Sequence, residues 1–373
     1  MKIGFDAKRA YTNATGLGNF SRCTILGLAR QYPDAWFYLF HPGKKRLSFN
    51  DPENTSEVEP VRVWWKTFSK VWRSFRIARL AKELQLDIYH GLSHELPFGI
   101  EKSGAKSIVT IHDLIFLRFP KFHKKIDREI YERKIRHSCR VATRVHAISE
   151  QTKLDLIELL GVPNDKIEVI YQSVNPLFYS ECSAEQKSAI RQKFQLPEQF
   201  LLNVGTIESR KNLVALLEGM VHSNIRIPLF VVGKPTDYKQ KAMEFIQSNA
   251  NDLQVTFLSG IQDSELTALY QMAEMMIYPS LYEGFGLPVA EAQACGCPVI
   301  TSNISSLPEA GGDGALYVNP EKPEKIGKAI ESLLTDKSLR EVMILKGKMN
   351  AQRFTLENFI KQLNQLYNSV LND

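Results

Sequence analysis

Cysteine is scarce and scattered in this sequence of 373 residues. The five cysteines include no Cys-x-x-Cys pair, and no pair of histidines lies near them. Zinc sites and disulfide-rich secreted domains both need closely spaced cysteines. We therefore expect reduced thiols, a cytoplasmic protein and no metal site. Cys295 and Cys297 are too close together for a usual zinc knuckle, so packing explains them better.

Long apolar runs are missing as well. No eighteen consecutive residues are apolar, so no segment is expected to span a membrane. The first residues, Met1 to Asp6, already predict a strand, and we expect no signal peptide ahead of it. Helix-turn-helix, zinc-finger and RNP patterns do not occur, which argues against nucleic acid as a partner.

The remaining totals describe a globular chain of two domains. Its length is large for a single hydrophobic core. Apolar residues make up 44% of the chain and charged residues 24%, as in ordinary globular proteins. The net charge of +6 favours an anionic partner without identifying it.

Short apolar runs alternate with helical patterns in both halves of the chain. This alternation predicts α/β domains, each with a parallel sheet covered by helices on both faces. In such sheets ligands collect at the carboxyl ends of the strands. The expected strands are 2–6, 35–40, 87–90, 106–111, 144–148 and 167–171 in the first half, and 200–205, 227–232, 255–258, 275–278 and 298–301 in the second.

The segment from Ser280 to Glu291 lies between two of these strands and predicts a loop followed by a short helix. The helix begins near Pro288 and ends at Gly296, residues suited to those two positions. Two glycines in the loop have no Cβ, so backbone amides can approach a ligand at the helix N-terminus, which favours an anion. We expect a diphosphate there.

This segment, Glu-Gly-Phe-Gly-Leu-Pro-x-x-Glu-Ala, resembles the signature of family 4 retaining glycosyltransferases. These enzymes have the GT-B fold, in which two Rossmann-like domains with parallel sheets face each other across a cleft. The resemblance covers nearly the whole chain. It implies an acceptor-side domain at 1–172 and a donor-binding domain at 176–352, with a last helix at about 355–373 that crosses back to the first domain.

The resemblance also implies residue roles at the donor site. Glu283 would hold hydroxyls of the donor sugar, and Glu291 would hold the ribose hydroxyls of the nucleotide. The other donor contacts would be Gly205, Lys234, Gly260, Ile261, Gly284, Phe285, Gly286 and Leu287, and Asp263 is expected to be only a helix N-cap. The alternative is that Glu283 is a solvated loop charge and Glu291 an ordinary helix carboxylate.

A donor diphosphate then needs cationic side chains to bind it. Arg210 and Lys211, which follow the strand at 200–205, are the candidates. Negative charge accumulates on the leaving phosphate as the glycosidic bond breaks, and fixed cations stabilise it. No Asp-x-Asp motif occurs, which is consistent with protein cations in place of a metal. A solvated helix start is the alternative explanation.

Two motifs of the first half are placed near the donor by the same resemblance. Gly16 and Gly18 would face the donor phosphates, although a glycine pair that merely eases a helix start is the alternative. They lie too far beyond the first strand for a dehydrogenase fingerprint. His112, at the end of the strand at 106–111, would contact the donor sugar, and Asp113 the acceptor. A core histidine with satisfied hydrogen bonds is the alternative for His112.

From Arg62 to Lys82 there are seven Lys or Arg residues and no acidic residue, interleaved with aromatic residues. A regular helix would gather Arg62, Lys66, Lys70 and Arg73 on one side and the aromatic residues on the other. A second basic group extends from Arg118 to Arg144. These segments suit an anionic membrane surface or a lipid-diphosphate acceptor. Alternatively, the aromatic residues pack on the sheet beneath a solvated face.

We therefore expect a metal-independent, retaining transferase without a bound cofactor. It would move a hexose from a nucleotide diphosphate sugar to a hydroxyl of a glycan or lipid-linked acceptor. The segment from His112 to His123 resembles bacterial mannosyltransferases of surface polysaccharide assembly, which favours GDP-mannose over UDP-hexoses and the inner face of the cell membrane. The alternatives are a nucleotide-sugar epimerase or hydrolase, a non-catalytic binding module and a glycosidase.

Overall fold

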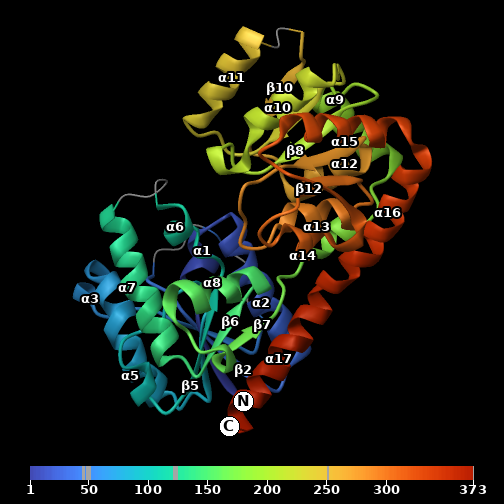
Figure 1. Ribbon diagram of the computed structural model, residues 1–373. Coiled ribbons are helices and arrows are strands. Elements are labelled where there is room, and N and C mark those ends of the chain that lie inside the picture. Colours follow the sequence, from blue (N-terminus) through green and yellow to red (C-terminus); the bar gives the residue numbers. More distant parts are fainter. Residues whose placement is uncertain (44–46, 48–51, 121–124, 250–251, 373) are drawn as a thin grey trace. The chain divides into compact units, whose positions relative to one another are not determined.

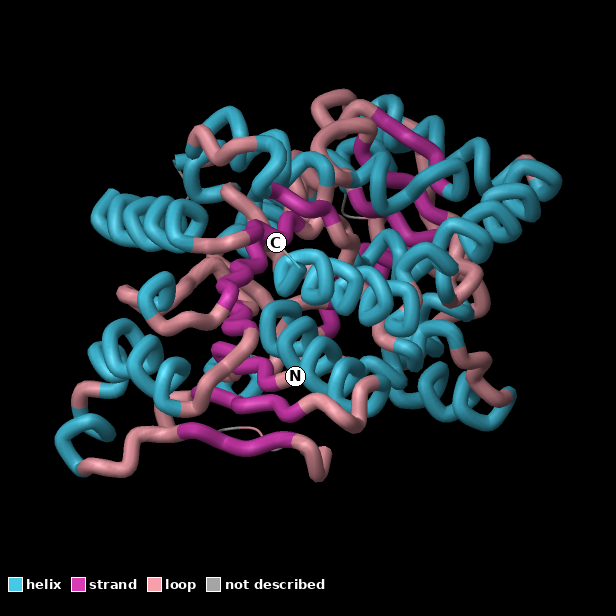
Figure 2. Tube along the Cα trace, turned by 90° about the horizontal axis from the view of Figure 1, so that it is seen from below, coloured by secondary structure: helices cyan, strands magenta, loops and turns pink. Residues whose placement is uncertain are grey.

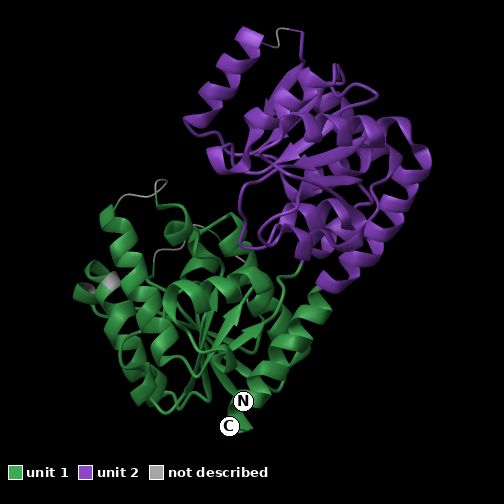
Figure 3. Cartoon of the chain, in the orientation of Figure 1, with its two compact units in different colours: residues 1–173, 356–373 green, residues 174–355 purple. Residues whose placement is uncertain are grey.

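The computed structural model describes residues 1–43, 47, 52–120, 125–249 and 252–372 (Figure 1). The chain divides into two compact units (Figure 3). Unit 1 comprises Met1–Ser173 and Leu356–Asp373, and unit 2 comprises Val174–Thr355. The final helix, which the resemblance assigns to the first domain, is therefore counted with unit 1. The acceptor-side and donor-side roles of the units stay predictions.

Unit 1 contains a parallel sheet of seven strands in the order β3-β2-β1-β4-β5-β6-β7. β1 lies beside both β2 and β4, with Lys2 opposite Trp36 and Ile3 opposite Ile88. Figure 2 shows helices on both sides of the strands near the N-terminus. The strands are β1 (Lys2–Asp6), β2 (Trp36–Phe40), β3 (Thr55–Val58), β4 (Ile88–Gly91), β5 (Lys106–Ile111), β6 (Arg144–Ala147) and β7 (Ile167–Val169).

Among the described helices of unit 1, α8 (Glu150–Leu160) has suitable residues at both ends. In α8, Ser149 accepts a hydrogen bond from the backbone N–H of Thr152, and Gly161 ends the helix in the left-handed conformation. The described helices are α1 (Lys8–Thr12), α2 (Gly16–Gln31), α3 (Val63–Thr67), α4 (Ser69–Val71), η1 (Trp72–Arg76), α5 (Ile77–Glu83), η2 (Ile100–Lys102), α6 (Ile115–Arg118), α7 (Lys125–Val141), α8 (Glu150–Leu160), η4 (Asn164–Lys166) and α17 (Leu356–Asn372).

The C-terminal helix α17 is part of the core of unit 1. Its buried face includes Phe359, Leu363 and Tyr367. It packs closely on α2, because a Cβ on Gly27 would lie only 2.7 Å from Ile360. The Tyr367 hydroxyl also hydrogen bonds to His90 Nδ1 at 2.7 Å. Apolar burial and a buried hydrogen bond therefore fix the end of the chain against the first sheet.

Unit 2 contains a second parallel sheet, with six strands in the order β10-β9-β8-β11-β12-β13. The strands are β8 (Leu201–Val204), β9 (Leu229–Val232), β10 (Val255–Leu258), β11 (Met275–Tyr278), β12 (Val299–Ser302) and β13 (Ala315–Val318). The helices are η5 (Pro176–Tyr179), α9 (Ala184–Phe194), η6 (Ser209–Lys211), α10 (Leu213–His222), α11 (Tyr238–Asn249), α12 (Asp263–Met272), α13 (Leu287–Ala294), α14 (Leu307–Gly311), η7 (Gly312–Gly314), α15 (Pro323–Thr335), α16 (Lys337–Ala351) and η8 (Gln352–Phe354).

Two parallel sheets with helices between their strands confirm the expected α/β class. The central strands are continuous apolar runs because both of their faces are covered, and all four residues of β8, β9 and β11 are buried. β3 and β13 were not predicted, because both are edge strands with half-buried residues. Across the described residues, no helix combines the length and apolar character needed to cross a bilayer.

The basic aromatic segment differs from the regular helix that its pattern predicts. It is divided into α3, α4, a π-helical turn (η1) and α5. The expected common face of four cations is wrong for Arg73, which is mostly buried and ion-paired to Asp6 and Glu95. Trp72 belongs to the core, whereas Phe75 is 58% exposed. Partners distant in the sequence therefore override the helical period here.

The exposed side of this segment is apolar as well as basic. Trp64, Phe68 and Val71 are 49%, 58% and 45% exposed, and Val61 before them is 86% exposed. The alternative that the aromatic residues all pack on the sheet is therefore wrong for this series. Several large apolar side chains remain accessible to a partner.

Candidate functional site

The predicted cations and Glu283 meet at the carboxyl ends of two neighbouring strands of unit 2. β8 pairs with β11 in the sheet. Arg210 and Lys211 lie on the turn η6 that follows β8, and Glu283 lies in the loop that leads from β11 to α13. Because parallel strands end at the same edge, residues more than seventy positions apart come into contact here.

Glu283 bridges the two cations. Its Oε2 lies 2.8 Å from Arg210 Nη1, and its Oε1 lies 2.6 Å from Lys211 Nζ. A second carboxylate, Glu208 Oε1, lies 2.5 Å from Arg210 Nη2. The side chains of Arg210, Lys211 and Glu283 are 14%, 13% and 9% exposed. We call these four residues the ion cluster; it holds two cations and two carboxylates.

The position of Glu283 is fixed by neutral groups around it. The Tyr278 hydroxyl donates to Oε1 at 3.0 Å, and the Ser280 hydroxyl donates to the same oxygen. The backbone is held too: Ser305 Oγ accepts from the Glu283 N–H at 2.9 Å, and Ser306 Oγ donates to its carbonyl at 2.9 Å. A carboxylate with this many donors is preorganised for binding.

The charges of the ion cluster determine the protonation of Glu283. Burial opposes the ionisation of Glu283, but Lys211 and Arg210 outweigh burial and hold its pKa at about 2. Burial lowers the pKa of Lys211, and Glu283 opposes that shift. Glu283 is therefore a stable carboxylate. An anion that enters the cluster must compete with Glu283 for the two cations.

Glu291 lies on α13 in a different environment. The Tyr270 hydroxyl donates to its Oε2 at 3.4 Å, and the structure gives it no cationic partner among the described residues. Burial, with a smaller contribution from Asp263, raises the pKa of Glu291 to about 7. Glu283 is thus ionised at every ordinary pH, whereas Glu291 titrates near neutrality.

Asp263 is not the N-cap that was expected. Gln262 is the N-cap of α12 and forms a capping box with Glu265, while Asp263 is the first helical residue. Its Oδ2 instead accepts a hydrogen bond from Asn175 Nδ2 at 3.0 Å. Asp263 also raises the pKa of Glu291, an effect that the sequence did not indicate.

The remaining donor-side candidates of unit 2 divide by exposure. Gly286 is the N-cap of α13 with φ of 111°, and a Cβ there would lie 2.8 Å from Leu307. The Phe285 side chain is buried edge-on against Phe354, with ring centroids 5.2 Å apart, so only its backbone remains for a ligand. Of the others, Lys234 and Gly260 are exposed, and Gly205, Ile261, Gly284 and Leu287 are half-buried.

Of the two candidate glycines in unit 1, only Gly18 has a structural role that its contacts explain. A Cβ on Gly18 would lie 1.7 Å from the Asn13 carbonyl oxygen, so close packing already requires glycine here, and the donor contact of Gly18 stays a prediction. Gly16, the first residue of α2, faces open space. The glycine pair therefore has one structural member and one that a ligand can approach.

His112 is buried, with both ring nitrogens hydrogen-bonded inside unit 1. Its Nε2 lies 2.9 Å from the Leu92 carbonyl oxygen, and its Nδ1 lies 3.0 Å from Gln172 Nε2. Burial lowers the pKa of His112 to about 3, so the imidazole is neutral. These contacts favour the core-histidine alternative, and the sugar contact stays a prediction. Asp113 Oδ1 accepts from the Ile115 N–H at 3.1 Å at the start of α6.

Sequence reasoning missed the neutral residues that support the ion cluster. Tyr278 is the last residue of a correctly predicted strand, so the strand-end rule could have found it. Ser305 adopts a φ of 57°, which is uncommon for a residue other than glycine and carries no sequence signal.

Two sequence models of known families match the chain. The model described as "Glycosyltransferase Family 4" matches residues 25–176, and the one described as "Glycosyl transferases group 1" matches residues 186–349. The first match lies in unit 1 except for its last three residues, and the second lies in unit 2.

Curated relatives carry related names. "O-antigen chain mannosyltransferase B" of Escherichia coli is 31% identical over 385 residues, which cover 98% of this chain and 99% of that protein. "O-antigen chain mannosyltransferase RfbU" of Salmonella typhimurium is 28% identical over 285 residues, which cover 76% of this chain and 74% of that protein.

The fold also matches solved structures. The crystal structure of Alr3699/HepE from Anabaena, in complex with UDP and glucose, superimposes with a TM-score of 0.74 at 18% identity, covering 99% of this chain and all of that one. At this identity the likeness concerns the fold alone. The relative that is 31% identical over the full length and the two family models show that the chain belongs to glycosyltransferase family 4 and is an enzyme of the hexosyltransferase class, and the solved structures show the GT-B fold.

Proposed function

We propose that this enzyme is a mannosyltransferase of surface polysaccharide assembly. It transfers mannose from GDP-mannose to a hydroxyl of a glycan or lipid-linked acceptor, with retention of configuration and without a metal ion. Two relatives named as O-antigen chain mannosyltransferases support the sugar and the process. A fold neighbour solved with UDP and glucose supports a nucleotide sugar as the donor.

The observation that carries the proposal is the ion cluster. Arg210 and Lys211 bind the diphosphate of the donor, and Glu283 accepts hydrogen bonds from hydroxyls of the sugar. Each carboxylate oxygen of Glu283 has more than one lone pair, so it can contact a cation and a hydroxyl together. The sugar and the diphosphate are neighbours in the donor, as Glu283 and its two cations are neighbours in unit 2.

The cations contribute most when the bond breaks. Charge develops on the phosphate oxygen as the anomeric carbon leaves it, and Arg210 and Lys211 stabilise that charge while Glu283 holds them in place. Because both cations are mostly withdrawn from water, their effect on developing charge is larger than in solution. In this proposal the protein cations supply what a metal supplies in other transferases.

Glu291 and the N-terminus of α13 complete the donor site in this proposal. The ionised Glu291 accepts from the ribose hydroxyls, and the free N–H groups that follow Gly286 face the diphosphate. Gly205, Lys234, Gly260 and Ile261 keep their predicted donor contacts, Gly16 and His112 remain contacts from unit 1, and Asp113 remains an acceptor contact.

We include attachment to the inner face of the cell membrane in the proposal. The exposed apolar residues of the segment 61–75 support it, with Lys66 exposed among them. Apolar and cationic side chains on one surface are the combination that binds anionic bilayers.

The test is a transfer assay with GDP-mannose and UDP-hexoses, with and without a glycan acceptor. We expect acceptor-dependent release of GDP, and we expect Arg210→Ala to lower kcat/KM by roughly 10² to 10³. Arg226→Ala is the control, because Arg226 forms a half-exposed ion pair with Asp252 in the same unit. GDP release that needs no acceptor would favour the hydrolase or epimerase alternative. Wild-type activity of Arg210→Ala would remove the ion cluster from the mechanism.

A further inference from the structure

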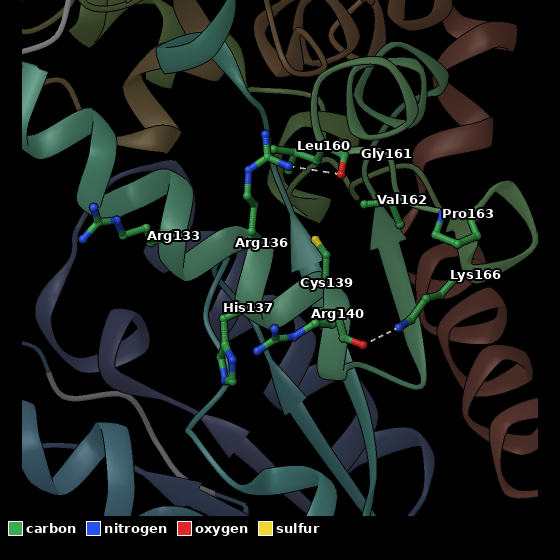
Figure 4. A pocket seen from close by; sticks show the side chains of 10 residues that line it. All are labelled: Arg133, Arg136, His137, Cys139, Arg140, Leu160, Gly161, Val162, Pro163 and Lys166. Atoms are coloured by element: carbon green, nitrogen blue, oxygen red, sulfur yellow. Dashed lines mark hydrogen bonds between the residues drawn. The ribbon is translucent and has the colours of Figure 1, made fainter.

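A cavity of about 620 Å³ lies in unit 1, and none of the predicted site residues lines it. It is formed by the second half of α7, the C-terminal end of α8 and the segment that leads into β7 (Figure 4). These helices end where β6 and β7 begin. The cavity therefore lies at the edge of the sheet opposite to the carboxyl ends of the strands, where His112 lies.

The cavity has a cationic rim. Arg133, Arg136, Arg140 and Lys166 line it together with His137, and no Asp or Glu is among its lining residues. One carboxylate, Glu132, lies 2.8 Å from Arg136 Nε at the margin. Among the described residues, Arg140 has no ion pair or side-chain hydrogen bond. In Figure 4, Arg133 extends away from the others, so the core of the rim is Arg136, Arg140 and Lys166.

Two of these cations are held in place by helix ends. Arg136 Nη2 and Nη1 donate to the carbonyls of Leu159 and Leu160 at 3.0 and 3.3 Å, and Lys166 Nζ donates to the Arg140 carbonyl at 2.8 Å. Helix C-termini carry roughly −0.5 charge each, which would otherwise repel an anion. Arg136 and Lys166 bind these helix ends, and three carboxylates lie nearby: Glu132 beside Arg136, Asp165 beside Lys166 and Glu101 beside His137. The positive charge that stays available at the rim therefore comes mainly from Arg140 and Arg133.

The floor of the cavity is apolar, and His137 at its margin has one ring nitrogen without a partner among the described residues. Cys139 and Val162 are 3% and 6% exposed, and Leu160 and Pro163 lie beside them. His137 Nε2 is buried without a hydrogen-bond partner in the part of the chain that the structure describes.

Exposed aromatic residues continue from the cavity. The Phe98 ring lies 4.2 Å from the His137 ring and stacks on Phe75 at 5.1 Å. Phe98 and Phe75 are 42% and 58% exposed. Phe75 belongs to the exposed apolar series of the segment 61–75, so that series adjoins the edge of the basic cavity.

We propose that this cavity binds the phosphate group of an acidic membrane lipid. The phosphate meets Arg140, Arg136 and Lys166, the first apolar part of the lipid lies on Leu160 and Val162, and Phe98 and Phe75 enter the bilayer surface. A free phosphate would use only a small part of a cavity of this size and would leave its apolar floor in water. The inference deepens the proposed membrane attachment and does not depend on the donor chemistry.

The test measures binding of the whole protein to vesicles of neutral phosphatidylcholine mixed with phosphatidylglycerol. Arg140→Gln removes one rim cation without removing a helix-end hydrogen bond, because only its backbone carbonyl accepts from Lys166. Each basic residue near a membrane is worth about 1 kcal/mol, so we expect roughly fivefold weaker binding. The control is Arg128→Gln, which removes the same charge from α7 outside the cavity. We expect a smaller loss there, because Arg128 does not line the cavity and would not contact the bound phosphate.

Three outcomes would overturn the proposal. Equal losses for Arg140→Gln and Arg128→Gln would mean diffuse attraction without a site. Equal binding to vesicles whose negative charge comes from a fatty acid would mean that phosphate is not recognised. Full displacement by millimolar glycerol phosphate would mean a soluble ligand in place of a lipid. Lys211→Ala should leave vesicle binding unchanged, which separates this test from that of the proposed function.

Discussion

Two regions of the molecule gather arginine and lysine side chains, and they differ in what accompanies the cations. In the ion cluster of unit 2, Arg210 and Lys211 are matched by Glu208 and Glu283 at 2.5 to 2.8 Å. In the cavity of unit 1, Arg136 is paired with Glu132 at 2.8 Å, whereas Arg140 forms no ion pair among the described residues and no Asp or Glu lines the cavity. The cations are therefore all matched by carboxylates in one region and only partly matched in the other.

The difference indicates different ways of binding an anion. A neutralised, mostly buried cluster attracts anions weakly at a distance, and its cations become available only to a ligand that also engages Glu283. That arrangement favours selectivity. An uncompensated rim attracts any anion over a longer range, with less discrimination and more dependence on salt. We expect the first property at a donor site and the second at a membrane contact.

The largest expected effect is that of Glu283→Ala. The variant loses the proposed sugar contact and leaves Lys211 and Arg210 without their shared partner. Breaking a buried pair in this way typically costs about 3 to 5 kcal/mol of unfolding free energy, and transfer should be nearly abolished. Urea unfolding and kcat/KM measure the two effects. Glu283→Gln keeps the volume but not the charge. Normal transfer by either folded variant would show that the matched charges of unit 2 are only structural.

The next effect concerns pH and distinguishes the two carboxylates of unit 2. Glu291 has a pKa of about 7 against an ordinary 4.5, so the folded protein holds this proton more tightly than the unfolded chain. Its contribution to stability is therefore present below pH 4.5 and is lost as pH rises through 7. The affinity for the donor should instead rise with pH through 7, because the ionised form of Glu291 binds the ribose hydroxyls.

Calorimetric titration with GDP-mannose between pH 5.5 and 8.5 measures that dependence. We expect the affinity to fall up to about tenfold per pH unit below 7, and to be nearly independent of pH in Glu291→Gln. In Asp263→Asn the midpoint should move to lower pH, because Asp263 helps to raise the pKa of Glu291. A wild-type affinity that is flat over this range would contradict the assignment of Glu291.

Salt should separate the two cationic regions directly. The rim of the unit 1 cavity is partly open to solvent, so vesicle binding should weaken by about tenfold between low and high salt. Donor binding at the buried ion cluster should change by less than about threefold, because buried pairs are screened less. Both binding constants are measured in the same buffers. Equal salt dependence would remove the distinction between the regions.

The smallest expected effect concerns a buried polar network without charge, which provides a baseline for both regions. The Tyr367 hydroxyl and Thr110 Oγ1 both hydrogen bond to His90, at 2.7 and 2.8 Å. Tyr367→Phe removes one of these bonds and should lower the unfolding free energy by about 1 to 3 kcal/mol, with no change in transfer. Urea unfolding measures it. A loss as large as that of Glu283→Ala would mean that charge is not what distinguishes the ion cluster.

Several features of the site could be predicted from the sequence because they follow local rules. Arg210, Lys211 and Glu283 lie in the loops that follow apolar strands, and parallel strands bring such loops to one edge. The short helix after Gly286 was predicted for the same reason, since glycine and proline mark helix ends locally. These rules give the neighbourhood of a residue but not its partner.

The partners depended on long-range packing. Arg73 fits the period of a solvated helix face, yet Asp6 and Glu95, from elsewhere in unit 1, bury it in ion pairs. The edge strand β3 lacks the apolar run of a central strand, and only its pairing with β2 identifies it. His137 and Lys166 carry no common motif, because the cavity between them exists only once α7, α8 and β7 are packed.

The sequence by itself determined the two α/β units, the family and the short list of residues at the strand ends, because periodicity, glycine placement and motif spacing are written in neighbouring positions. Only the tertiary structure decided which charges are matched. The Glu283 bridge and the uncompensated rim at Arg140 both depend on which side chains lie within a few ångströms of each other. Electrostatic energy varies with distance and burial. Arginine and lysine side chains are therefore matched by carboxylates in unit 2 but only partly matched in unit 1.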